Sequence, residues 1–307
     1  MHRTLVVASI LSLLAAGCGA DADEPAADPS SVAAAGGDAY DDAPAARRAS
    51  PPGRAGAGAA SAAPDAAPPA DPVEEMRDPR RARSAPRSPA LLATEVQGLE
   101  SLAQASAPGS PDRPAVLRRL AEDYVELEAA ALRDRSPAAP SRTAERARAA
   151  AIRWYGKLVA EAAASTYPQL DEARYFLAWE YERSGDLADA RRLYLDLVSK
   201  NASSRYAPLA YFAFGEMFLH ESEGGGDASK LPVAAEAYEK VASSPPPGNA
   251  AYGWAWVRLA QIAEKQGDRA RALAAYRRAD DFARLFPQLP SARGVAAAIP
   301  AWVAGAS

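Results

Sequence analysis

WVRLAQIAEKQGDRARALAAYRRA, Trp256 to Ala279, contains two amphipathic segments separated by a Gly-Asp turn. In each segment apolar residues recur at intervals of three and four, which gives a helix one apolar stripe. The first stripe comprises Trp256, Leu259, Ala260 and Ala263, and the second comprises Ala272, Leu273, Tyr276 and Ala279. Gly267 can end the first helix in a left-handed conformation, and the Asp268 side chain can cap the second. The stretch therefore predicts a helical hairpin.

The same order of residues occurs at least twice upstream. LAWEYERSGDLADARRLYLDL, residues 177–197, repeats the Gly-Asp turn and the Ala-x-x-x-Tyr pattern, and a third copy carries Gly215 and, after a longer loop, Ala234 and Tyr238. Unrelated amphipathic helices in a bundle, the simpler alternative, would not repeat these features in register. Residues 117–124 and 151–158 match a fourth, more divergent copy, but the Pro- and Arg-containing stretch 133–142 separates them, and whether they form a true repeat stays open.

This order resembles the tetratricopeptide (TPR) repeat, W-x2-L-G-x2-Y followed by A-x3-F, with a period near 34 residues. The small residue of the first helix is Ala178, Gly215 and Ala260 here, so the spacings are 37 and 45, from 215 − 178 and 260 − 215. The resemblance implies an all-α solenoid of helical hairpins. The implied repeats are 114–167 (divergent), 168–204, 205–248 and 249–287, followed by a C-terminal cap at 288–307.

The N-terminus, MHRTLVVASILSLLAAGCGA, has a short basic start, an apolar run and small residues before Cys18. This pattern is typical of a secretory signal peptide, here residues 1–17. Ala15-Ala16-Gly17-Cys18 resembles the lipobox of bacterial lipoproteins, which implies that Cys18 is lipidated and anchors the chain to a membrane. An ordinary cleaved signal with an incidental cysteine is the alternative. Because Cys18 is the only cysteine, no disulfide framework is expected.

Residues 18–87 are rich in Ala, Pro, Asp, Ser and Arg and contain one aromatic residue, Tyr40. Such a composition cannot bury enough apolar surface to offset its ordering entropy, so we expect a disordered tether. Its last part contains a cluster of arginines: Arg77, Arg80, Arg81, Arg83 and Arg87. This cluster can contact anionic lipid or glycan, or it can simply belong to a solvated linker. Every Trp and Phe lies after residue 153, which places the packed helical domain at 88–307, with a leading helix around Leu92 to Leu99.

Catalytic chemistry has few candidate residues. His220 is the one histidine after the signal peptide, so zinc sites and Ser-His-Asp or Cys-His catalysis lack their components, and we expect no metal and no cofactor. The formal net charge of −4 gives no reason to expect nucleic-acid binding. Glu172, Glu180 and Glu182 keep open an alternative, a peptidoglycan-active enzyme that uses helix carboxylates.

The resemblance also implies a concave groove that binds a partner protein. By resemblance to the family, ligands contact the second, fifth, ninth and twelfth positions of each repeat. In this sequence those positions are Glu172, Tyr175, Trp179, Glu182, Leu209, Phe212, Glu216, Leu219, Trp254, Val257, Gln261 and Glu264. Buried aromatic residues are typical binding anchors, whereas rim charges such as Glu182 and Glu264 are expected to contribute little. The alternative is that a neighbouring helix or the trailing segment covers these aromatic residues. These positions lack the Lys, Arg and Asn of the TPR subgroup that binds terminal carboxylates, so that activity is not expected.

The combination of a lipobox with such repeats resembles the BamD-like and YbgF-like periplasmic TPR lipoproteins of Gram-negative bacteria. It implies an outer-membrane, lipid-anchored protein that faces the periplasm and binds one or more envelope proteins. We therefore expect a non-enzymatic interaction scaffold. The peptidoglycan-active enzyme and a purely structural spacer remain the alternatives, and the resemblance does not identify the partner.

Overall fold

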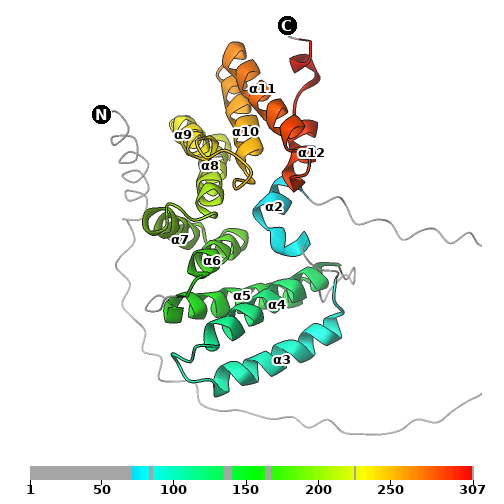
Figure 1. Cartoon of the computed structure of the whole chain (residues 1–307), viewed down its shortest axis with the longest axis vertical. Helices are drawn as coiled ribbons and strands as arrows, with labels where there is room; N and C mark the ends of the chain where they lie inside the picture. Colours follow the sequence, from blue (N-terminus) through cyan, green and yellow to red (C-terminus); the bar gives the residue numbers. More distant parts are fainter. Residues whose placement is uncertain (1–70, 83–85, 134–139, 163–166, 225, 306–307) are drawn as a thin grey trace, which may run out of the picture. The chain divides into compact units, whose positions relative to one another are not determined.

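The computed structural model describes residues 71–82, 86–133, 140–162, 167–224 and 226–305 (Figure 1). Within these ranges all regular secondary structure is helical, which confirms the predicted all-α fold. Cys18, the signal peptide and the tether as far as residue 70 lie outside the described residues. No helix within the described ranges is both long enough and apolar enough to cross a membrane.

Four helical hairpins follow one another along the chain. They are α4 (Arg113–Arg133) with α5 (Pro140–Ala162), α6 (Leu170–Ser184) with α7 (Leu187–Lys200), α8 (Ala207–Gly224) with α9 (Lys230–Ala242), and α10 (Tyr252–Lys265) with α11 (Arg269–Leu285). The two helices of each hairpin pack together, and each hairpin packs on the next, as a solenoid requires. Each hairpin falls within one of the expected repeat ranges, except that α4 begins one residue before the first range.

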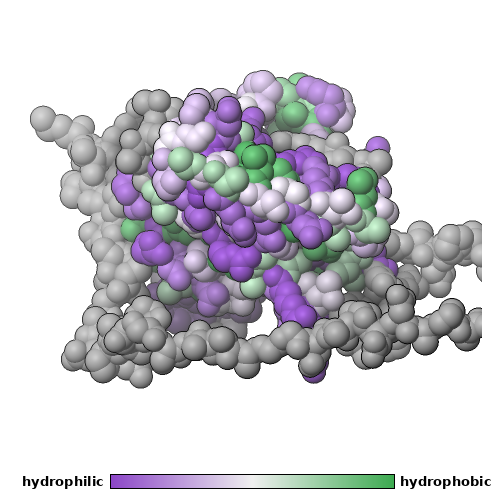
Figure 2. Space-filling model, turned by 90° about the horizontal axis from the view of Figure 1, so that it is seen from below, coloured by the Kyte–Doolittle hydropathy of each residue, from purple (hydrophilic) through white to green (hydrophobic). Residues whose placement is uncertain are grey.

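Further helices flank the hairpins. The expected leading helix is α3 (Pro89–Ala105), which packs on α4, and the C-terminal cap contains α12 (Pro290–Ala297) and the 3-10 turn η2 (Ala301–Val303). Viewed from the α3 end, the surface is largely hydrophilic, and its hydrophobic residues form small separate patches (Figure 2).

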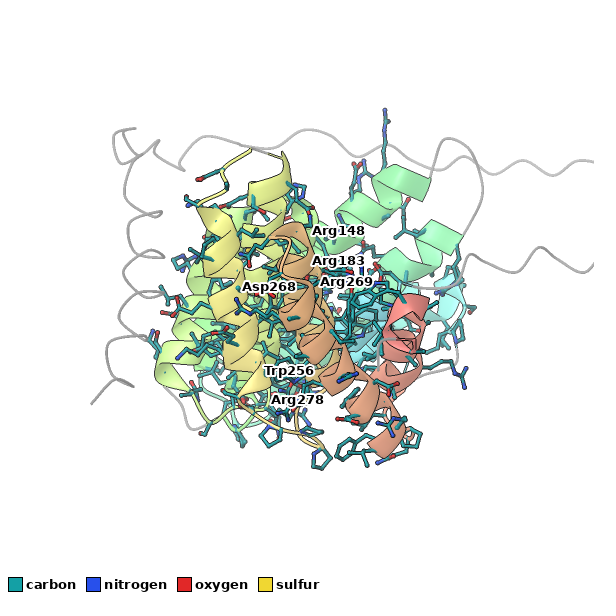
Figure 3. The ribbon with its side chains drawn as sticks, turned by 90° about the horizontal axis from the view of Figure 1, so that it is seen from above. Arg148, Arg183, Trp256, Asp268, Arg269 and Arg278 are labelled. Carbon is teal, nitrogen blue, oxygen red and sulfur yellow. The ribbon has the colours of Figure 1, made fainter. Side chains whose placement is uncertain are left out.

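The hairpin turns use the Gly-Asp pairs as the sequence suggests. Gly185 and Gly267 have positive φ angles of 92° and 75°, a left-handed conformation that glycine adopts without steric cost. Asp268 caps α11 by accepting a hydrogen bond from the Arg271 backbone N–H at 2.9 Å (Figure 3). Short turns of this kind hold the two helices of a hairpin antiparallel.

Small residues bring the helices of each hairpin close together. Ala178 and Ala260 are fully buried, and Gly215 lies so close to the ring of Tyr238 that an added Cβ would lie 2.5 Å from Tyr238 Cε1. The tyrosines of the Ala-x-x-x-Tyr pattern lie in the core of their hairpins: Tyr194, Tyr238 and Tyr276. The spacing in the sequence thus reflects helix packing within each hairpin.

The structure differs from the sequence prediction at residues 71–82, which were expected to be disordered. Residues Pro72–Arg77 form helix α2, and Pro79–Ala82 form a 3-10 turn, η1. Asp71 caps α2 by accepting a hydrogen bond from the Val73 backbone N–H at 2.8 Å, and Pro72 occupies the first turn. Helix α2 packs against α12 (Figure 1). Composition alone missed this segment because its stability comes from contacts with the rest of the domain.

Candidate functional site

The predicted groove residues lie on one face of α6, α8 and α10, called the groove face below. The structure buries seven of the twelve: Glu172, Tyr175, Trp179, Leu209, Phe212, Trp254 and Val257. Glu182, Glu216, Leu219 and Gln261 are partly buried, and Glu264 is exposed. All four aromatic residues predicted as binding anchors, Tyr175, Trp179, Phe212 and Trp254, are therefore already buried.

Residues 71–82 cover the part of the groove face that α6 forms. Arg77 lies over the Trp179 ring, 4.2 Å from its centroid, and donates two hydrogen bonds to the Glu182 carboxylate at 2.8 and 2.5 Å. Tyr175 donates its hydroxyl to the Arg77 carbonyl at 2.9 Å. The Trp179 indole N–H donates to Asp78 Oδ2 at 3.2 Å. Tyr175 and Trp179 thus bind a segment of their own chain.

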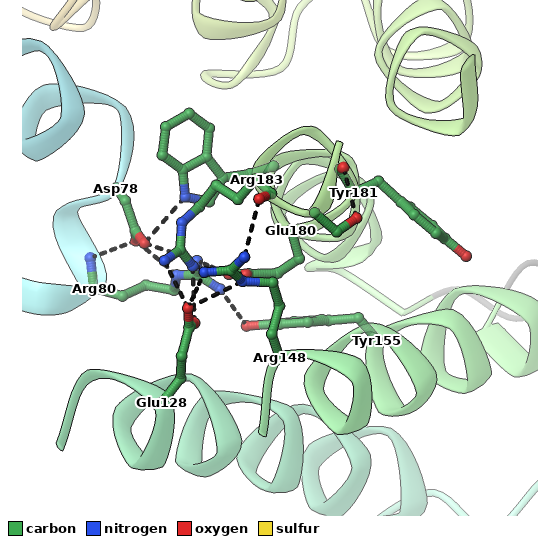
Figure 4. A network of polar contacts seen from close by, with 10 residues as sticks. Asp78, Arg80, Glu128, Arg148, Tyr155, Glu180, Tyr181 and Arg183 are labelled. Carbon is green, nitrogen blue, oxygen red and sulfur yellow. Dashed lines mark hydrogen bonds and ion pairs between the residues drawn. The ribbon is translucent and has the colours of Figure 1, made fainter. Parts of the chain in front are cut away.

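A second arginine of the segment enters the same surface. Arg80 donates to Asp78 at 2.7 Å and to Glu180 Oε1 at 2.5 Å, and both carboxylates are fully buried. Its Nη1 also donates to the Tyr155 hydroxyl at 3.2 Å (Figure 4). The Arg80 guanidinium carbon lies 4.0 Å from the centroid of the Phe176 ring. The surface that receives both arginines is called the arginine site below; it comprises Tyr155, Phe176, Trp179, Glu180, Glu182 and Tyr194.

Further charges extend this network beneath the segment. Glu128 of α4, which is fully buried, accepts hydrogen bonds from Arg148 and from Arg183, the latter at 2.8 Å (Figure 4). Arg183 also donates to Glu180 Oε2 at 2.9 Å. Burial alone would raise the pKa of Glu128, but the hydrogen bonds and charges of Arg183 and Arg148 lower it below its usual value.

The charges of the network balance only when the segment is present. Its carboxylates are Asp78, Glu128, Glu180 and Glu182, and its guanidinium groups are Arg77, Arg80, Arg148 and Arg183. Without residues 71–82, three carboxylates would face two guanidinium groups. This surface would then carry an excess negative charge, so its electrostatics favour a cationic occupant.

Glu182 corrects the expectation that rim charges contribute little. Its side chain is 16% exposed, pairs with Arg77 through two parallel bonds and accepts a third hydrogen bond from the Tyr194 hydroxyl at 2.9 Å. Paired and largely buried, it is a central contact of the arginine site. The structural reason is that residues 71–82 shield it from water.

The Tyr194–Glu182 hydrogen bond recurs in the next two hairpins. Tyr238 donates to Glu216 Oε1 at 2.5 Å, and Tyr276 donates to Glu264 Oε2 at 2.9 Å. In each case the hydroxyl of a buried tyrosine on the second helix reaches a glutamate on the groove face. From their spacing in the sequence these tyrosines were predicted only to be packing residues. The repeated pairing of a tyrosine on the second helix with a glutamate at a groove position is the signal that indicates these hydrogen bonds.

The groove face of α8 and α10 contains an open cavity of about 400 Å³. Its lining includes four predicted groove residues, Glu216, Leu219, Gln261 and Glu264, together with His220, Glu223, Arg258 and Lys265. Arg258 donates to both oxygens of Glu216, at 2.7 and 2.9 Å, and to Gln261 Oε1 at 3.0 Å. These bonds hold the polar groups of the cavity in fixed positions.

Trp254, the remaining aromatic anchor predicted from the sequence, lies where α2, α10 and α12 meet. A Cβ added to Gly294 of α12 would lie 2.7 Å from Pro72 Cβ and 3.0 Å from Trp254 Cζ2. The glycine therefore permits close contact of α12 with both elements. Trp254 is covered by the trailing helix, as the alternative for this residue proposed.

The arginine cluster expected in the tether contacts the helical domain. Besides Arg77 and Arg80, Arg87 donates to Asp123 at 2.7 Å and to Glu126 Oε2 at 2.9 and 2.5 Å. These three arginines bind carboxylates of the domain instead of forming a free basic cluster. The Arg81 side chain and Arg83 lie outside the described residues.

The candidate catalytic glutamates do not form a free carboxylate pair. Glu180 and Glu182 are both bound by arginines of residues 71–82, and Glu172 is buried and lies 3.5 Å from Arg118 and 3.6 Å from Arg205. Within the described ranges, no group of three or more His, Cys, Asp or Glu side chains has an arrangement that would hold a metal ion.

Comparisons with known proteins add no assignment: a scan against protein-family models, a search of curated proteins and a search of solved structures found no match.

Proposed function

We propose that this protein is a non-enzymatic, lipid-anchored scaffold of the bacterial cell envelope that binds a partner protein through its groove face. The main support is the open cavity between α8 and α10, because four residues predicted from the TPR resemblance line it: Glu216, Leu219, Gln261 and Glu264. Its volume of about 400 Å³ lies within the range of natural binding sites and suits one or two protruding side chains.

The contacts of the groove face with residues 71–82 give further support. This face binds a short helix through aromatic rings, carboxylates and a buried hydroxyl, for example Trp179, Glu182 and Tyr175. A surface with that chemistry is suited to recognising protein segments. The cavity continues the same face beyond the segment, so we propose that it receives the partner.

The peptidoglycan-active alternative has less support from the geometry. A glycosidase needs one carboxyl group that donates a proton and a second that acts as base or nucleophile. In the cavity, Glu216 accepts hydrogen bonds from Tyr238 and Arg258, and Glu264 accepts one from Tyr276, so both are held as acceptors. Release of fragments from peptidoglycan by the full-length protein, abolished by Glu216→Gln, would favour the enzyme over the scaffold.

Site-specific photo-crosslinking in bacterial cells that carry the full-length chain tests the scaffold directly. A photoreactive residue replaces His220, which is exposed at the cavity, and a matched control replaces Leu285, which is 71% exposed on α11. We expect a discrete cross-linked protein from position 220 and none from position 285. Equal products from both positions, or none from position 220 in cells with normal protein levels, would contradict partner binding at the cavity. The second result would favour the structural spacer.

A further inference from the structure

Residues 71–82 contact the groove face in the manner of a bound peptide. Helix α2 contains six residues, too few to be stable in isolation, so its conformation depends on the surface that it contacts. The four hairpins pack directly on one another without it. The segment is thus an addition to the solenoid, and removing it leaves the contacts between the hairpins in place.

The arginine site selects arginine specifically. Arg77 and Arg80, three residues apart, each have a guanidinium group over an aromatic ring, Trp179 or Phe176, and each pairs with a carboxylate of α6. A planar guanidinium group can stack on a ring and form parallel bonds to a carboxylate at the same time, whereas a lysine ammonium group cannot. Asp78, between them, accepts from the Trp179 indole and from Arg80, which fixes the register of the segment.

An empty arginine site would be unfavourable. Without the segment, Glu182 would keep the hydrogen bond from Tyr194 but lose its ion pair with Arg77, and Glu180 would keep Arg183 but lose Arg80. Another segment with two arginines at the same spacing would restore both pairs. Because folding of α2 is coupled to its binding, part of the contact energy is used in ordering the segment, and a partner segment that is already helical would avoid this cost.

We propose that the arginine site is a binding site for helical segments of partner proteins that carry the pattern Arg-Asp-x-Arg, and that residues 71–82 occupy it as an internal ligand that such a partner displaces. This inference goes beyond the proposed function, which concerns the cavity between α8 and α10. The covalent link gives residues 71–82 an effective concentration on the order of millimolar, so the partner must bind more tightly or be locally concentrated.

The test uses the full-length chain and a fluorescent peptide of residues 71–82, DPVEEMRDPRRA. Arg77→Ala plus Arg80→Ala in the protein removes both internal arginines, so the peptide should bind this variant at least about tenfold more tightly than wild type, where the internal segment competes. A control peptide with lysine at the positions of Arg77 and Arg80 keeps the charge and should bind the variant at least about tenfold more weakly than the arginine peptide. Adding Trp179→Ala to the variant should abolish binding of the arginine peptide.

Equal peptide affinity for wild type and variant, or no binding to the folded variant at about 1 mM peptide, would overturn the proposal. Hydrogen exchange on the wild-type chain supplies a test that needs no variant: saturating peptide should accelerate exchange of the backbone amides in α2 but not in α11. Unchanged exchange in α2 would also overturn it. If the wild-type protein dimerises and the arginine variant does not, the ligand of the arginine site is a second copy of the chain instead. A failed cross-link at position 220 leaves this test unaffected, because the two arginines of the peptide contact residues of α5, α6 and α7 and not the cavity.

Discussion

Gly215→Ala should destabilise the domain, whereas Gly98→Ala should stabilise it. In a helix, replacing glycine by alanine gains about 1 kcal/mol from backbone propensity alone. Gly98 is exposed on α3, and a Cβ there would have no atom within 4 Å. At Gly215 on α8 the Cβ would lie 2.5, 2.6 and 2.8 Å from three ring carbons of Tyr238.

The ring of Tyr238 cannot easily make room for that methyl group. It is fully buried, and its hydroxyl is bonded at 2.5 Å to Glu216, which Arg258 also holds. Relaxed carbon contacts are about 3.5–4.0 Å, so the two helices would have to separate by roughly 1 Å. Overpacking of this kind costs about 1–3 kcal/mol. Since both variants gain the same propensity, we expect Gly215→Ala to be less stable than Gly98→Ala by about 1–3 kcal/mol.

Thermal unfolding followed by circular dichroism at 222 nm measures the difference. For a domain of this size about 1 kcal/mol corresponds to roughly 2–4 °C in Tm, so the Tm values should differ by about 2–12 °C, with Gly98→Ala higher. Urea unfolding gives an independent value. A Gly215→Ala protein that melts at or above the Tm of Gly98→Ala would refute the argument that this glycine exists for close helix packing.

Two further predictions concern the charge network and the N-terminus. The pKa of Glu128 is lower in the folded protein than in the unfolded chain, where it is near 4.3. The ionised Glu128 therefore stabilises the fold above about pH 4.3, and this contribution is lost as the pH falls through the pKa of the folded state. Wild type should therefore lose more unfolding free energy than Glu128→Gln between about pH 5 and pH 3, and parallel losses in urea titrations would refute this assignment. Cys18→Ala should release the protein from membranes or leave it unprocessed, as cell fractionation and the mass of the mature chain would reveal, and a correctly processed variant that stays on the membrane would count against lipid anchoring.

The sequence predicted the hairpins well because their determinants are local. The Gly-Asp turns at Gly185 and Gly267 and the apolar spacing around Tyr194 and Tyr276 are properties of short segments. Even the divergent unit forms a hairpin, α4 with α5, because its apolar residues keep the helical interval despite the irregular linker between them. The periodicity of apolar residues is sufficient to predict the fold where each helix packs mainly on its sequence neighbours.

The candidate site was predicted less well, because its occupant is distant in sequence. Arg77 and Glu182 are 105 residues apart, and the pairing of two charged residues leaves no periodic signal. Asp71-Pro72 followed by Glu74 and Glu75 is a helix-start pattern that was available, but the surrounding composition favoured disorder. Four of the groove positions transferred from the TPR resemblance line the open cavity, but the resemblance did not reveal that Tyr175 and Trp179 were covered.

The position of α2 also determines how the domain carries mechanical load. Tension applied to the chain before Asp71 reaches α2 first, and α2 packs on α12 and binds α6 through Arg77 and Asp78. The leading helix α3 begins only at Pro89, after the segment. A pull on the chain ahead of Asp71 is therefore transmitted to the domain first through the contacts of α2 with α6 and α12. Rupture of these contacts under load would uncover Trp179, which would couple tension on the chain to exposure of the groove face.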